Sequence, residues 1–83
     1  MSTPNIDRLA GQGVQFTNAY ATSATSTPSR FGLLTGMYPW RQENTGIAPG
    51  NSELIIDTTC ITMADMLKDA GYATGAVGKW HLG

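Results

Sequence analysis

The sequence predicts an α/β fold, because segments in which apolar residues recur at helical spacing alternate with short segments typical of strands. Helical patterns occur over residues 4–13, 28–37 and 62–70, and the strand-like segments are 14–20 and 72–77. With 83 residues the chain can form one small domain, and its charged residues amount to 13%, against about 25% in an average soluble domain. We therefore expect other polypeptide to cover part of its surface.

The first helix is predicted to begin at Pro4, with Thr3 as its N-cap, and to end at Gly11 and Gly13. A short strand over residues 14–20 follows, with alternate side chains on its two faces. A polar loop of small residues then leads to the second helix.

The second helix is predicted to start at Pro28, to be capped by Ser26 or Thr27, and to stop at Tyr38-Pro39. Gly32 lies inside this helix, where glycine costs about 1 kcal/mol relative to alanine. The helical spacing of the apolar side chains supports the prediction nevertheless: Phe31, Leu34 and Met37.

The segment from Arg41 to Thr59 has no periodicity, and its glycine and proline cluster predicts a surface loop. Thr62 and Asp65 then form a pair like a capping box, with Asp where Glu or Gln is usual, at the start of a third helix. Gly71 is the expected left-handed C-cap of that helix.

The second strand, over residues 72–77, leads to Lys79 and His81 just past its carboxyl end, where the ligand sites of open α/β sheets collect. These two residues are two positions apart, so on an extended segment their side chains project to the same side. Trp80 then points the opposite way, and we expect it in the core.

Composition excludes several classes of function. The net charge is −1 and no cluster of Lys or Arg occurs, which disfavours binding to nucleic acid or to a membrane surface. No run of about 18 apolar residues could span a membrane, and the start of the chain lacks the pattern of a signal peptide. Cys60 is the only cysteine, so it forms no disulfide within the chain, and we expect it to be a small buried residue.

Two motifs identify a family resemblance. Ser26 to Gly36 matches the signature of the type I sulfatases, which reads Cys or Ser, any residue, Pro, Ser, Arg, any three, Leu or Met, Thr, Gly. Gly78-Lys79-Trp80-His81-Leu82-Gly83 resembles the end of the second signature of the same family. Residues 3–10 and 14–20 are similar to the family's run upstream of the nucleophile, whereas residues 42–57 have little family character.

The resemblance implies an amino-terminal, incomplete part of a bacterial sulfatase catalytic domain over residues 1–83. The whole domain would be an alkaline-phosphatase-like sandwich, with helices packed on a mostly parallel sheet. The parent protein would be periplasmic or secreted, with its export signal upstream of this chain. The implied activity is hydrolysis of sulfate esters to an alcohol and sulfate, and we expect the isolated chain to be inactive.

By resemblance, Ser26 is the precursor of the nucleophile. In the family this residue is oxidised by a maturase to formylglycine, and a serine at this position points to the oxygen-independent bacterial route. The hydrated aldehyde has two hydroxyls: one attacks sulfur, and loss of the proton from the other expels sulfate. A helix N-terminus favours such an anionic centre. Taken alone, Ser26 would be only a helix cap.

The resemblance also assigns roles to three further residues. Arg30 would hydrogen-bond formylglycine and support it against the metal, Lys79 would contact sulfate and formylglycine, and His81 would act as the general base. Ser29 would support local hydrogen bonding and recognition by the maturase, or would be an ordinary serine of the first turn.

The family binds a divalent cation, generally calcium, and Ser26, as formylglycine, is the only position here that matches a ligand. Calcium takes about 6 to 8 oxygen ligands. The aspartates lie where capping or surface roles suffice: Asp7, Asp57, Asp65 and Asp69. We therefore expect no metal in this chain, with calcium belonging to the full-length parent.

Three other interpretations of the sequence differ from a sulfatase. A phosphate-binding P-loop at Gly78-Lys79 fails, because Ala73 and Trp80 occupy two of its required positions. A phosphonate or phosphodiester hydrolase of the same superfamily would also use formylglycine. A noncatalytic piece could self-associate through an uncovered sheet edge and apolar faces.

Overall fold

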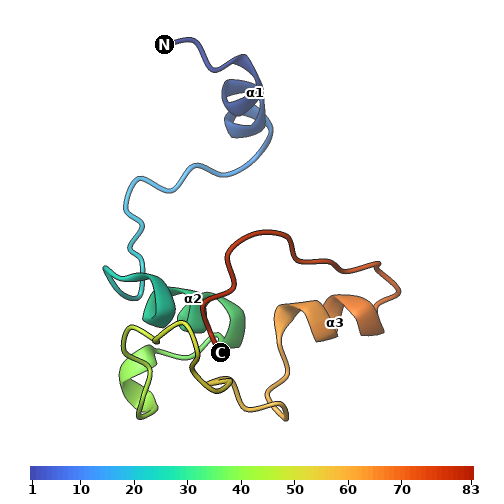
Figure 1. The fold of residues 1–83 in the computed structure, drawn as a ribbon. Helices are drawn as coiled ribbons and strands as arrows, with labels where there is room; N and C mark the ends of the chain where they lie inside the picture. The colour runs from blue at the N-terminus through green and yellow to red at the C-terminus, as the bar shows by residue number, and fades with distance from the viewer.

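Three α-helices and one turn of 3-10 helix are joined by irregular segments in the computed structural model, which describes residues 1–83 (Figure 1). The elements follow one another along the chain as α1 (Pro4–Gln12), α2 (Ser26–Thr35), η1 (Pro39–Arg41) and α3 (Met63–Asp69). The radius of gyration is 15.6 Å, whereas a compact domain of this length has about 12 Å. The chain is therefore extended for its length.

Helix α1 begins where the sequence predicts, with Thr3 at the N-cap and Pro4 in the first turn, and it ends at Gly13. The Thr3 hydroxyl does not cap the backbone but donates to Asp7 Oδ1 at 3.0 Å. No residue of α1 is buried, and Figure 1 shows the helix set apart from the rest of the chain.

Helix α2 starts two residues before the predicted position, at Ser26, with Thr25 as its extended N-cap residue. Pro28 fits in its first turn, because the first N–H groups of a helix have no intrahelical partner. The predicted stop at Tyr38-Pro39 was wrong. Gly36 ends the helix in the left-handed conformation (φ 69°), and its N–H donates to Gly32 O.

Helix α3 confirms the predicted capping box. The Thr62 hydroxyl accepts from the Asp65 N–H, and Asp65 Oδ2 accepts from the Thr62 N–H at 2.8 Å. At the other end Gly71 has a positive φ (88°), its N–H donates to Lys68 O, and the Tyr72 N–H donates to Leu67 O. These two bonds form a Schellman motif.

Neither predicted strand is formed, so a layered α/β sheet is not shown by this chain. Residues 14–20 and 72–77 are irregular, and their large apolar side chains are exposed. A strand needs a neighbouring strand to satisfy its backbone N–H and C=O groups. No such neighbour lies within the 83 residues.

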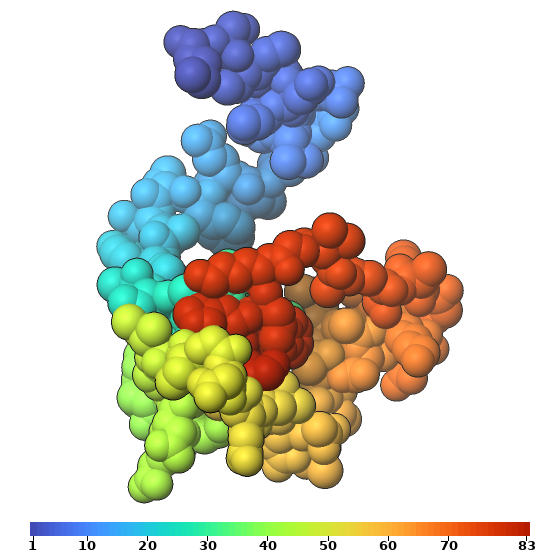
Figure 2. Space-filling model, in the orientation of Figure 1, coloured from blue at the N-terminus to red at the C-terminus, as the bar shows by residue number.

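The small core lies between α2 and the C-terminal segment. Phe31 and Leu82 are fully buried, and the Ile55 N–H donates to Leu82 O at 2.9 Å. Figure 2 shows the C-terminal segment (red) against the segment that contains Ile55 (yellow). Only 8 of 83 residues are buried. Large apolar side chains are therefore left without cover, as the low charge content predicted.

Two expectations about the core were wrong. Trp80 is 45% exposed, because its indole N–H donates to Gly83 O on the same short segment instead of packing inward. Cys60 is only half-buried, because the few contacts around the start of α3 do not enclose it. No helix has both the length and the apolar character needed to cross a membrane.

Candidate active site

The candidate site lies where the N-terminus of α2 meets the C-terminal segment. Ser26 is the first residue of α2, and its hydroxyl contacts side chains from two directions. Arg30 Nε, one helical turn further on, donates to Ser26 Oγ at 2.9 Å. His81 Nδ1 lies 3.2 Å from the same oxygen, although 55 positions separate the two residues.

The second ring nitrogen of His81 is held as well. Nε2 lies 2.8 Å from Ala48 O. A carbonyl oxygen can only accept a hydrogen bond, so Nε2 has the proton, and Nδ1 of the neutral ring is free to accept from the Ser26 hydroxyl. The geometry thus lets Ser26 Oγ accept from Arg30 and donate to His81.

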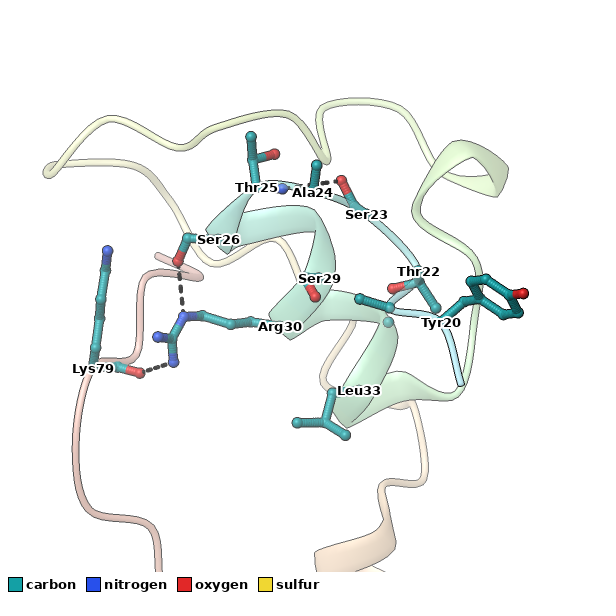
Figure 3. Close-up of a pocket in the computed structure, with 12 residues that line it drawn as sticks. Tyr20, Thr22, Ser23, Ala24, Thr25, Ser26, Ser29, Arg30, Leu33 and Lys79 are labelled. Atoms are coloured by element: carbon teal, nitrogen blue, oxygen red, sulfur yellow. Dashed lines mark hydrogen bonds between the residues drawn. The ribbon is translucent and has the colours of Figure 1, made fainter. Parts of the chain in front are cut away.

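Lys79 reaches the site by its main chain. Arg30 Nη1 donates to Lys79 O, so the guanidinium bridges this carbonyl and Ser26 Oγ (Figure 3). The Lys79 side chain is exposed and makes no hydrogen bond or ion pair. The predicted extended geometry for this segment was wrong, because His81 adopts a left-handed backbone conformation (φ 56°).

A hollow of about 950 Å³ opens beside Ser26 and Arg30, with Ser29 and Lys79 also in its wall. Ligand pockets commonly measure about 300 to 1,000 Å³. The rest of the lining is the polar loop before α2 together with Gly32 and Leu33, and Figure 3 shows this loop crossing beside the helix. No acidic residue lines the hollow, and two cationic residues do, so it suits an anion.

The residues of this chain do not fit a calcium site. No three Asp, Glu, His or Cys side chains are grouped to hold a metal ion. Three carboxylates are engaged locally: Asp7 with Thr3, Asp57 with Thr59 and Asp65 with Thr62. Hydrogen bonds from the Thr59 backbone and side chain lower the pKa of Asp57. Hydrogen bonds from the Thr62 side chain and backbone do the same for the pKa of Asp65.

Sequence reasoning missed Ala48 and Thr27 as parts of the site. Ala48 lies in the segment from Arg41 to Thr59, which the sequence predicts as a surface loop, yet it is buried and contacts His81 through its carbonyl oxygen. Its N–H donates to the buried Thr27 hydroxyl at 3.1 Å. Any residue type can make a hydrogen bond through its main chain, so no signal in the sequence could have located Ala48.

Comparison with known proteins assigns the chain as a whole to a family. The sulfatase family profile matches residues 1–83. The chain therefore belongs to the sulfatase family, which confirms the predicted resemblance.

Three relatives show how far the similarity extends. The chain is 93% identical over its whole length to an N-acetylgalactosamine-6-O-sulfatase of Bacteroides thetaiotaomicron, and covers 16% of that protein. It is 47% identical to human steryl-sulfatase, with 98% of the chain and 15% of the relative covered. A solved chain, described under metabolism of multiple glycosaminoglycans by B. thetaiotaomicron, has 94% identity and a TM-score of 0.85, over 98% of this chain and 17% of that one.

Proposed function

We propose that this chain supplies the nucleophile side of a sulfatase active site, which hydrolyses a sulfate ester to an alcohol and sulfate. One observation supports the proposal above the others: Ser26 Oγ lies between Arg30 Nε at 2.9 Å and His81 Nδ1 at 3.2 Å. The oxygen of a nucleophile at this position has both a donor to stabilise negative charge and a base to take a proton.

The position of Ser26 fits conversion to formylglycine, because its side-chain oxygen has one charged donor and one acceptor within hydrogen-bond distance. In its hydrated form that group supplies two hydroxyls on one carbon, one for attack on sulfur and one for the release of sulfate. Formylglycine also requires a maturase, and we include that enzyme as a transient partner.

The residues of the chain then have distinct roles. Arg30 orients the reactive oxygen and ties it to the main chain at Lys79. His81 Nδ1 removes the proton from the oxygen on residue 26. The free Lys79 ammonium, at the wall of the hollow, balances the charge of the sulfate group.

We propose the 6-sulfate of N-acetylgalactosamine as the substrate group, on the basis of the 93% identity to the B. thetaiotaomicron enzyme. Calcium, the sheet of the α/β fold and the residues that recognise the sugar belong in this proposal to the remainder of a sulfatase. The chain alone is then inactive, because it has a single candidate ligand for the metal.

A graft tests the proposal. The matching segment of the B. thetaiotaomicron relative is replaced by these 83 residues, and sulfate release from N-acetylgalactosamine 6-sulfate is measured after maturation. We expect turnover in the graft, none in its Ser26→Ala variant and none in the isolated chain. A graft that binds the sulfated sugar but is no more active than its Ser26→Ala variant would contradict the proposed role of this segment.

The exposed apolar side chains favour a second proposal for the isolated chain, namely self-association. Val14, Phe16 and Leu33 are at least 75% exposed, and such surface promotes association in water. Sedimentation velocity over a range of concentrations is expected to show oligomers. A monomer at all concentrations would exclude this behaviour.

A further inference from the structure

We infer that Thr27 is a positioning residue for His81, which it orients through Ala48. The inference deepens the proposed function and rests on it, because it explains how the base that faces Ser26 keeps the required tautomer.

The first contact joins α2 to Ala48. Thr27 is fully buried, and its Oγ1 accepts from the Ala48 N–H at 3.1 Å, across 21 positions of sequence. Thr27 belongs to the first turn of α2, so its backbone is fixed by the helix. A buried hydrogen bond from a fixed helical residue sets the position of Ala48.

The second contact joins Ala48 to the imidazole. Ala48 O accepts from His81 Nε2 at 2.8 Å. With the proton held on Nε2, the lone pair of Nδ1 faces Ser26 Oγ. If Ala48 moved away, the ring could rotate or change tautomer, and Nδ1 would no longer be a dependable acceptor.

The main chain around His81 leaves the ring dependent on this contact. His81 has a left-handed φ of 56°, which is uncommon for a residue other than glycine. The next residue is anchored, because Leu82 is fully buried and its carbonyl accepts from Ile55. The backbone thus brings the ring to the site, and Ala48 O determines which nitrogen has the proton.

The arrangement couples two neighbouring residues. Ser26 provides the reactive oxygen, and Thr27, the next residue along the chain, orients the base for that oxygen. The signature allows any residue at position 27, so the motif alone gives Thr27 no role.

The test uses the fact that His81 is the only histidine of the chain. In ¹⁵N NMR spectra of the 83-residue chain, we expect the Nε2–H tautomer and an Nε2–H proton protected from exchange with water. Thr27→Ser keeps the hydroxyl and is expected to keep that proton signal. Thr27→Val keeps the shape but removes the acceptor, and the signal is expected to broaden or disappear while the Ile55–Leu82 backbone contact remains.

Three results would overturn the inference: an Nδ1–H tautomer in the unsubstituted chain, loss of the protected proton in Thr27→Ser, or its retention in Thr27→Val. The first two apply even if Thr27→Val fails to fold. In the sulfatase graft, Thr27→Val should lower kcat by about tenfold or more at similar KM, as when other orienting partners of histidine are lost. The NMR result needs no substrate, so it fails or succeeds independently of the sulfatase proposal.

Discussion

Ser26 Oγ and His81 Nδ1 lie 3.2 Å apart, and each belongs to one of the two signature motifs of this chain. The contact is made without the sheet that the sequence predicted. Leu82 is fully buried and its carbonyl accepts from the Ile55 N–H, and Arg30 of α2 donates to Lys79 O, so these contacts hold the C-terminal segment at the helix N-terminus.

Arg30→Lys in the sulfatase graft should reduce kcat by about 100-fold, although the charge is kept. Lysine lacks the planar fork that lets Arg30 donate to Ser26 Oγ and Lys79 O together, and loss of one donor to a reacting oxygen commonly costs about 10² to 10³ in rate. Steady-state kinetics measures the loss. The matched control is Arg41→Lys, since Arg41 is exposed on η1 and its side chain makes no contact at the site. Equal effects of the two changes would argue against the bridging role of Arg30.

Lys79→Ala in the graft should raise KM more than it lowers kcat and should leave the fold intact. The side chain is free, whereas the contact that holds the segment uses the Lys79 carbonyl, which alanine retains. Lys68→Ala, on the exposed face of α3, is the control and should leave both constants unchanged. An unchanged KM in Lys79→Ala would show that the Lys79 side chain does not bind sulfate.

Gly32→Ala should destabilise the chain, by roughly 1 to 3 kcal/mol as for other overpacked sites, even though alanine is the better helix former. A Cβ at Gly32 would clash with Thr22 Oγ1, which is buried without a hydrogen-bond partner. Gly11→Ala in α1 is the control, because a Cβ there meets nothing within 4 Å and should only increase helicity. Thermal unfolding followed by circular dichroism measures both. Adding Thr22→Gly to Gly32→Ala should restore stability, and a failure to do so would contradict the contact.

The capping box of α3 should weaken in acid. The Thr62 side-chain and backbone hydrogen bonds lower the pKa of Asp65 in the folded chain. The carboxylate therefore contributes stability above its ordinary pKa, and this contribution is lost as the pH falls through the lowered folded value. A ¹³C NMR titration of the carboxyl groups measures the shift. Thr62→Val should return the Asp65 titration toward its ordinary value, and an unchanged titration would show that the cap is not the cause.

The local features were predictable because they depend on neighbours in sequence. The Thr62–Asp65 capping box and the left-handed Gly71 follow from the backbone groups at the ends of α3. The spacing of the motif also places Ser26 and Arg30 one helical turn apart on α2, where they are hydrogen-bonded.

The predictions that were wrong concern features that depend on residues distant in the sequence or outside the chain. Residues 14–20 and 72–77 have the composition of strands, but no strand lies beside them to accept their hydrogen bonds. Trp80 was expected inside on the alternation of an extended segment, and the left-handed turn at His81 breaks that alternation. Ala48 contributes main-chain atoms only, which no residue pattern reveals.

The Ser26 side chain lies against the His81 imidazole. This contact is tested most directly by a nuclear Overhauser effect between the Ser26 β-protons and the His81 ring proton Hε1, which lies next to Nδ1. The account predicts this cross-peak in the 83-residue chain, together with one between the backbones of Ile55 and Leu82. A chain that shows the Ile55–Leu82 cross-peak but none between Ser26 and His81 would contradict it.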